Sequence, residues 1–474
     1  MKALRRNVKI AIVVLLIITL GLGYGLFYQM EQSQTSLLAV AGENKQSLAK
    51  LYSQAGTIYT RDKVKLATSE SGRREYAENP SLEQASSHIV GDYTHHMSNT
   101  IETLYQNELL GKNRNIIDQL LLDFSGEGLQ GDDLYLTLDS GLETHAYDLL
   151  KNNKGAAVVM NYKTGEILAS VSTPATSMDN IIAYENIPDT ALYNRALNGA
   201  YMPGSTWKIV TSAAWLNSNS YDPDLIIETN GEPIRANGAS DADYKHISGK
   251  YDLYRAFAES CNVFFGELAV KMGQEEFMQA IERMGLEDIK NVDRLNLTPA
   301  VIDNSAAKDD PALLSWFGVG QAAGDLKINL SPTEIALISS AVANNGKMPE
   351  PHLVDYKMNV LGKDELSEVK TKEVLNPMVA DKVEQLMLGA INSDFSFLSS
   401  MKISGYDVAG KTGTVQVQAD GQNSTNSLFT GFIANDSDNP FVVAVVLEDK
   451  DNANTTATAI ARSLLVYAIN NILV

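Results

Sequence analysis

The residues best suited to chemistry in this chain are a serine and a lysine three positions apart. Only Ser205 combines this spacing with a preceding Pro-Gly pair and a following apolar stretch, which predicts the start of a buried helix. Spacing of three on a helix puts Lys208 on the same face as the Ser205 hydroxyl. The free N–H groups at a helix start can also stabilise negative charge on a reacting carbonyl. Serine followed by lysine at this spacing occurs five times, at Ser47, Ser205, Ser305, Ser367 and Ser399.

A serine hydroxyl needs a base close by to act as a nucleophile at neutral pH. Lys208 can serve if burial keeps it neutral part of the time. Histidine is the competing base, but no histidine here belongs to a G-x-S-x-G elbow or an H-E-x-x-H pair. Adjacent His95 and His96 point to different sides of a regular element, so neither a metal site nor a cofactor is expected. The six histidines are His88, His95, His96, His145, His246 and His352.

Two later segments offer complementary groups. Ser260-Cys261-Asn262 supplies a hydroxyl and an amide that can relay a proton and hold a substrate amide. Lys411-Thr412-Gly413-Thr414 leads into a predicted strand, and its lysine and threonines suit a carboxylate, while glycine lets a ligand approach the strand closely. Each pattern has decoys elsewhere, so the order of the three segments carries the interpretation. The lone Cys261 is expected to be a buried, inert thiol.

The elements that must position these residues indicate an α/β or α+β domain. Alternation and β-branched runs predict an early hairpin and three late strands, which short turns make antiparallel. Apolar periodicity predicts helices between them and at the C-terminus. The predicted strands are 134–138, 155–160, 167–172, 413–418, 427–433 and 441–447, and the predicted helices are 206–216, 252–272, 275–284, 332–343 and 456–472.

Composition and the N-terminus restrict the location and the partners. The formal charge of −20 argues against a nucleic-acid partner, since phosphate binding needs a positive field. Residues 10–28 carry no charge, and a helix of that length spans the bilayer core. Because only basic charges precede them, the short tail is expected inside the cell and the rest of the chain outside. A cleaved signal peptide is the alternative, although the apolar run is longer than usual.

The three segments, in this order, resemble the S-x-x-K, S-x-N and K-[ST]-G motifs of the penicillin-binding protein and serine β-lactamase superfamily. The likeness is closest to the class B, monofunctional transpeptidases and covers about 134–474 well. The family's late Gly-Gln-Gly loop is replaced here by Gly318-Val319-Gly320-Gln321-Ala322-Ala323-Gly324. Further similar segments are 155–174, 194–196, 201–204 and 331–333.

The resemblance implies roles for these residues in peptidoglycan cross-linking. Ser205 would attack the penultimate D-Ala carbonyl of a D-Ala-D-Ala stem peptide, with Lys208 as base. Ser260 would pass a proton to the leaving amine, and Asn262 would hold the donor peptide. The substrate carboxylate would meet Lys411, Thr412 and Thr414, with Gly413 between them, and the N–H groups of Ser205 and Thr414 would form the oxyanion hole. β-Lactams would acylate Ser205 instead.

The N-terminal pattern and the resemblance together imply an organisation, and alternatives stay open. The expected organisation is a cytoplasmic tail (1–9), a transmembrane anchor (10–28), a stalk and N-terminal pedestal module (29–131), and a transpeptidase domain with a central antiparallel sheet flanked by helices (132–474). Expected partners are stem peptides, β-lactams and the membrane, with a membrane glycosyltransferase as a candidate. A D,D-carboxypeptidase or β-lactamase would use the same residues with water as acceptor. A non-catalytic β-lactam sensor or scaffold is the alternative from another class.

Overall fold

A five-stranded antiparallel sheet is the centre of the protein in the computed structural model, which describes residues 45–112, 114, 131–241, 248–359, 362–419 and 422–473. Every neighbouring pair of strands in this sheet is antiparallel, as predicted. The early hairpin therefore pairs with the last strand of the late meander. In spatial order the strands are β17 (Asp407–Ala419), β18 (Gln422–Ala434), β19 (Phe441–Glu448), β5 (Lys154–Asn161) and β6 (Ile167–Thr173).

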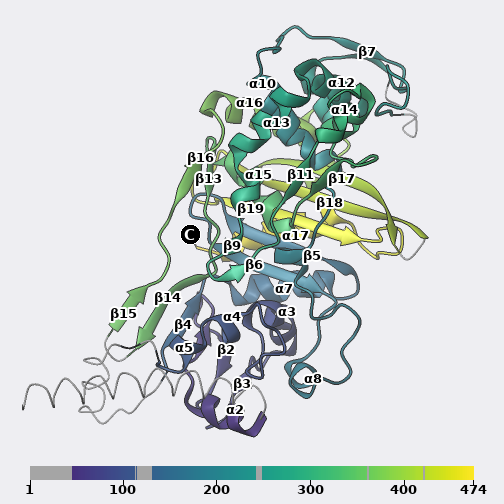
Figure 1. Cartoon of the computed structure of the whole chain (residues 1–474). Helices are drawn as coiled ribbons and strands as arrows, with labels where there is room; N and C mark the ends of the chain where they lie inside the picture. Colours follow the sequence, from purple (N-terminus) through teal and green to yellow (C-terminus); the bar gives the residue numbers. More distant parts are fainter. Residues whose placement is uncertain are drawn as a thin grey trace, which may run out of the picture.

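Helices cover both faces of this sheet. Successive side chains of a strand point to opposite faces, and β19 shows this directly. Val443 and Val445 pack with α7 (Ser140–Leu150) and α17 (Ala457–Asn471). On the other face, Val442, Ala444 and Val446 pack into a hydrophobic core that includes residues of α15 (Pro332–Ala343). Figure 1 shows α15 and α7 on opposite sides of the sheet. The central sheet flanked by helices is thus confirmed.

A group of helices packs beyond α15 and carries much of the predicted chemistry. One prediction is wrong here, because 252–272 is not a single helix but α11 (Leu253–Ala258) followed by α12 (Asn262–Met272). Ser260 adopts a left-handed backbone conformation with φ of 58°, which no α-helix can accommodate. The other helices of this group are α10 (Lys208–Leu216), α13 (Gln274–Met284), α14 (Pro311–Gly318) and α16 (Pro377–Asn392).

The N-terminal part folds around a second sheet. Its strands are β15 (Gly362–Glu365), β14 (Val354–Asn359), β4 (Asp133–Leu136), β1 (Ile58–Tyr59), β2 (Lys65–Thr68) and β3 (Glu75–Tyr76). The helices beside it are α2 (Lys45–Leu51), α3 (Pro80–Val90), α4 (Ile101–Leu104) and α5 (Gln106–Leu109). Strands from both sides of the predicted 131/132 boundary share this sheet, since β4, β14 and β15 follow that boundary in sequence. The boundary itself stays a prediction.

The smaller elements connect these parts. Among the described residues, no helix is both long and apolar enough to cross a bilayer, and the predicted anchor 10–28 lies outside them. The paired short strands are β7 (Ile227–Thr229) with β8 (Gly249–Tyr251), β9 (Asn291–Val292) with β10 (Leu295–Asn296), β11 (Val301–Asp303) with β12 (Lys327–Asn329), and β13 (Lys347–Pro349) with β16 (Thr371–Glu373). Two short helices are α8 (Met178–Ala183) and α9 (Arg195–Asn198).

Candidate active site

Ser205 lies in a tight turn at the start of a buried helix. The turn is the 3₁₀ helix η2 (Gly204–Trp207), which continues directly into α10, whereas the sequence predicted one helix from 206. The Thr206 hydroxyl donates to the Pro203 carbonyl at 2.7 Å, and the Trp207 ring is fully buried. The Ser205 side chain is only half-buried. The turn is therefore fixed on its inner side while its serine stays accessible.

Strand β17 packs closely against this turn. Gly204 has φ of +52°, and a Cβ there would lie 2.6 Å from Val415 Cγ2 and 3.1 Å from the Thr414 carbonyl oxygen. A Cβ on Gly413 would lie 2.7 Å from the Pro203 carbonyl oxygen. Glycine is thus needed on both sides of the contact. Because Gly204 precedes Ser205, the contact brings the Ser205 turn beside the backbone of Thr414.

Gly320 also supports the Ser205 turn, and it belongs to the loop 318–324 that differs from the family's Gly-Gln-Gly pattern. The Gly204 N–H donates to the Gly320 carbonyl at 2.9 Å. Gly320 has φ of +76°, and a Cβ there would lie 2.2 Å from the Gly204 carbonyl oxygen. The Thr211 hydroxyl donates to the Gly318 carbonyl at 2.7 Å. The loop that departs from the family pattern therefore still packs against the candidate nucleophile's turn.

Lys208 is fully buried and bonded to the second predicted motif. Its Nζ donates to the Ser260 carbonyl at 2.6 Å and to Asn262 Oδ1 at 2.7 Å. The Ser260 Oγ lies 3.2 Å away, within hydrogen-bond distance. An ammonium has three donors, and these three neutral oxygens match them. Hydrogen bonds to neutral groups compensate only partly for the lost hydration of a cation.

The third motif converges on the same hydroxyl. Lys411 Nζ is 2.8 Å from Ser260 Oγ, and the Lys411 side chain is buried. Ser260 Oγ thus sits between the ammonium groups of Lys208 and Lys411. The ring of Phe265 lies 5.4 Å from Lys208 Nζ and that of Phe257 5.8 Å from Lys411 Nζ. These distances suit cation–π contacts, which offset part of the desolvation of each lysine.

Burial lowers the pKa of both lysines. Desolvation lowers the pKa of Lys208 to about 8, although the negative charge of Asp241 opposes the shift. Burial and the charge of Lys208 hold the pKa of Lys411 well below its usual range. A Lys208 amine that loses its proton near neutral pH can accept one from Ser205. A carboxylate placed beside Lys411 would favour its charged form.

The turn between α11 and α12 is anchored by a carboxylate that sequence reasoning missed. Asp241 is buried and accepts hydrogen bonds from the Asn262 N–H at 2.7 Å and the Val263 N–H at 3.2 Å. The Cys261 thiol donates to it at 3.1 Å and accepts from the Phe264 N–H at 3.4 Å. Cys261 is therefore a buried helix cap, as expected of an inert thiol, and burial raises its pKa.

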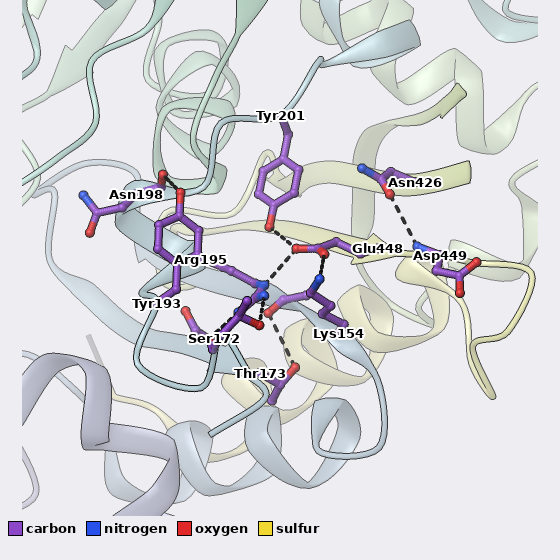
Figure 2. A network of polar contacts seen from close by, with 12 residues as sticks. Lys154, Ser172, Thr173, Tyr193, Arg195, Asn198, Tyr201, Asn426, Glu448 and Asp449 are labelled. Atoms are coloured by element: carbon purple, nitrogen blue, oxygen red, sulfur yellow. Dashed lines mark hydrogen bonds and ion pairs between the residues drawn. The ribbon is translucent and has the colours of Figure 1, made fainter. Parts of the chain in front are cut away.

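A separate polar cluster holds the chain just before the Ser205 turn (Figure 2). The carboxylate of Glu448, at the end of β19, accepts from Arg195 Nε and from the Tyr201 hydroxyl, each at 2.8 Å. Lys154 Nζ lies 2.9 Å from its other oxygen. The Tyr201 backbone also exchanges both hydrogen bonds with Leu330. We call Lys154, Arg195, Tyr201 and Glu448 the glutamate cluster.

The four other serine–lysine pairs have no comparable setting. Their lysines, Lys50, Lys308, Lys370 and Lys402, are all exposed, whereas Lys208 is fully buried. The structure brings Lys208, Ser260, Asn262 and Lys411 into hydrogen-bonding contact, and it places Gly413 against the Ser205 turn. Thr412 is half-buried and Thr414 exposed. The carboxylate-binding role of these two threonines stays a prediction.

Comparison with known proteins agrees with this geometry. Residues 155–466 match the model of the penicillin binding protein transpeptidase domain. The chain therefore belongs to that family. It is 26% identical to the peptidoglycan D,D-transpeptidase PbpA of Mycolicibacterium smegmatis, with 96% of each chain covered.

Two solved structures share the fold. One is the D,D-transpeptidase domain of a peptidoglycan glycosyltransferase from Eggerthella lenta, with a TM-score of 0.72 and 29% identity, covering 88% of this chain and 99% of that one. The other is a ceftriaxone acyl-enzyme complex of penicillin-binding protein A from M. tuberculosis, with a TM-score of 0.74 and 24% identity, covering 89% and 100%. The transpeptidase fold predicted from the sequence is thus confirmed.

Proposed function

We propose that this protein is a serine D,D-transpeptidase that cross-links peptidoglycan stem peptides through an acyl-Ser205 intermediate and is acylated there by β-lactams. The observation that carries the proposal is the convergence of two buried lysines, Lys208 and Lys411, on the Ser260 hydroxyl beside the Ser205 turn. Membership of the transpeptidase family and the likeness to PbpA support it.

Acylation begins with neutral Lys208 taking the proton of Ser205 as the serine oxygen bonds to the penultimate D-Ala carbonyl. The backbone N–H groups of Ser205 and Thr414 stabilise the resulting oxyanion. The C–N bond to the terminal D-Ala then breaks, and the proton passes through Ser260 to the leaving nitrogen. Lys208 and Lys411 on either side of Ser260 Oγ support this relay.

Substrate positioning falls to Asn262 and strand β17. Asn262 holds the amide of the donor peptide, while Lys411, Thr412 and Thr414 bind its terminal carboxylate. β17 is an edge strand of its sheet, so an extended peptide can align along it by main-chain hydrogen bonds. In the second step an amine from a neighbouring stem peptide attacks the acyl carbon. The amine nitrogen loses a proton as the Ser205 ester bond breaks, and that proton passes to the serine oxygen and regenerates the hydroxyl.

The location proposed for this activity is the outer face of the cell membrane. Residues 10–28 form an uncharged run preceded only by basic charges, which supports a single-pass anchor with the domain outside. A membrane glycosyltransferase is the proposed partner, because cross-linking requires newly made glycan strands.

Labelling with a fluorescent penicillin tests the nucleophile. The parent protein is expected to form a covalent adduct, and Ser205→Ala to form none. Ser305→Ala is the matched control, since Ser305 has the same spacing to a lysine but is exposed. Equal labelling of the parent and Ser205→Ala, or of neither, would reject the assignment.

Product analysis tests the choice of acceptor. A D-Ala-D-Ala stem peptide is incubated with and without an amine acceptor, and the products are separated by mass. Transpeptidation predicts a new amide product that appears only with the amine. Hydrolysis alone under both conditions would instead identify a D,D-carboxypeptidase using the same residues.

A further inference from the structure

Asp241 contacts the turn that presents Ser260 and Asn262, yet it takes no part in the proposed reaction steps. Its side chain is 1% exposed, and its two oxygens accept from the backbone N–H groups of Asn262 and Val263 and from the Cys261 thiol. These are the first two residues of α12 and its cap. A carboxylate in this position satisfies N–H groups that the helix leaves unpaired and interacts favourably with the helix dipole.

The residue next to Asp241 orients the Asn262 amide. The Ser240 carbonyl accepts from Asn262 Nδ2 at 3.1 Å. Since the nitrogen end of the amide is engaged there, the oxygen end faces Lys208 Nζ at 2.7 Å. Ser240 and Asp241 therefore hold the backbone and the side chain of Asn262 together.

The held turn contains a conformation that needs support. Ser260 has φ of 58°, a left-handed conformation that is strained for a residue with a Cβ. Its neighbour Cys261 donates its N–H to the Ala256 carbonyl at 2.8 Å, and the Asp241 carboxylate secures the other side of the turn. This geometry turns Ser260 Oγ toward both Lys208 and Lys411.

We infer that Asp241 is a positioning residue of the Ser205 centre, which holds the Ser260–Asn262 turn so that Ser260 Oγ and Asn262 Oδ1 face Lys208. The inference rests on the proposed function. Asp241 also sets the charge around the base. Within the described part of the chain, the groups that face Lys208 are the neutral oxygens of Ser260 and Asn262, the Phe265 ring, the neutral Cys261 thiol, the cation of Lys411 and the anion of Asp241.

Because the Asp241 charge raises the pKa of Lys208, removing that charge should lower this pKa, and the direction of the change can be measured. In Asp241→Asn the ammonium form loses its nearby anion, so the rising limb of the pH–acylation profile moves to lower pH by about one unit. The loosened turn lowers the plateau rate roughly tenfold or more, because small misplacements at a reacting centre are costly. Cys261→Ala removes the thiol that donates to the carboxylate, so the negative charge of Asp241 is less compensated. Because burial raises the pKa of Cys261, the lost thiol is itself neutral, and the rising limb of this variant moves by a smaller amount to higher pH.

The experiment measures the second-order rate of acylation by a fluorescent penicillin between pH 6 and 10, with thermal melting to confirm folding. Glu143→Gln is the matched control, because Glu143 is also a fully buried carboxylate bonded to a backbone N–H, but it lies in the core beneath the sheet. Its profile is expected to coincide with that of the parent.

Each outcome has a defined meaning. A limb for Asp241→Asn that coincides with the parent's, at any plateau height, overturns the inference and leaves Asp241 a structural cap. If Asp241→Asn does not fold, Cys261→Ala decides, and an unmoved limb in that variant overturns the inference. Failure of the proposed function would appear separately, as Ser205→Ala labelling equal to that of the parent.

Discussion

The lysine pair at the active site and the glutamate cluster lie at opposite ends of the segment 201–208, and they treat buried charge in opposite ways. In the glutamate cluster, Arg195 and Lys154 both contact the carboxylate of Glu448. Burial raises the pKa of Glu448, but hydrogen bonds from Lys154 and Arg195 outweigh it, and the net pKa is below its usual value. Every charge there has a partner of opposite sign.

Among the residues that the structure describes, the lysine pair has no such partner in direct contact. Lys208 and Lys411 donate to neutral oxygens of Ser260, Asn262 and Thr412, and both have a lowered pKa. A buried cation without a counter-ion costs stability, and groups with such shifted pKa values gather at functional sites. The comparison suits a structural role for the glutamate cluster at the approach to Ser205 and the proposed role of Lys208 as a proton acceptor.

Replacing the base while keeping its charge gives the largest expected effect. Lys208→Arg keeps a cation but cannot lose its proton, so acylation should fall about 10³-fold. The measurement is the second-order rate of penicillin acylation. Lys154→Arg, in the glutamate cluster, should stay within about twofold of the parent, because that site needs only a charge. A Lys208→Arg variant as fast as the parent would show that charge, not proton transfer, is what the site requires.

Breaking the glutamate cluster should reduce stability rather than chemistry. Glu448→Gln leaves Arg195 buried without its anion and should lower the free energy of unfolding by about 2–4 kcal/mol, measured in urea. The acylation rate of the folded fraction should change only a few-fold. The pKa of Glu448 is lower in the folded protein than in the unfolded chain, where it is ~4.3. The stabilisation by Glu448 is therefore fully present above the unfolded pKa and is lost as pH falls through the folded pKa. The difference between parent and variant should therefore shrink on acidification.

The pH dependence of acylation tests the lysine pair without mutation. In the proposed mechanism only neutral Lys208 accepts the Ser205 proton, so the rate should rise about tenfold per pH unit and level off above about 8. The titration of Lys208 also changes stability. Between pH of about 8 and the pKa of this lysine in the unfolded chain, the unfolded state binds more protons than the folded state. Lys208 therefore contributes a free energy of unfolding that rises with pH across that window. A rate that is flat from pH 6 to 9 would contradict the role of Lys208.

Short-range patterns account for what could be predicted from the sequence. The Pro-Gly lead-in, helix start and serine–lysine spacing selected Ser205 and Lys208 as candidates, and period-two alternation predicted the strands of the central sheet. The continuous apolar run 252–272 predicted one helix because nothing in it marks the left-handed Ser260. The likeness to a known family, not periodicity, assigned Ser260 and Lys411 to one substrate site, and the structure brings their side chains into contact.

Contacts between residues far apart in the chain could not be predicted from the sequence. Asp241 lies about twenty residues before the turn that it holds, in a stretch of glycines and aspartates that resembles any polar loop. The six-stranded sheet joins β1 to β4, and β4 to β14, across large gaps in the chain. Pairings of this kind depend on tertiary packing, and local propensity does not determine them.

The smallest predicted effect, that of Tyr201→Phe on stability, tests whether the glutamate cluster and the lysine pair have separate roles. Tyr201→Phe removes one hydroxyl hydrogen bond to Glu448 and should cost about 1 kcal/mol of unfolding free energy. Tyr193→Phe, a neighbouring hydroxyl on a more exposed ring, is the control and should cost less. The acylation rate of both variants should match that of the parent, because the Tyr201 backbone stays paired with Leu330 and keeps the Ser205 turn in place. If Tyr201→Phe slows acylation more than tenfold while its stability stays near that of the parent, the glutamate cluster orients the nucleophile directly, and the division of labour drawn above is wrong.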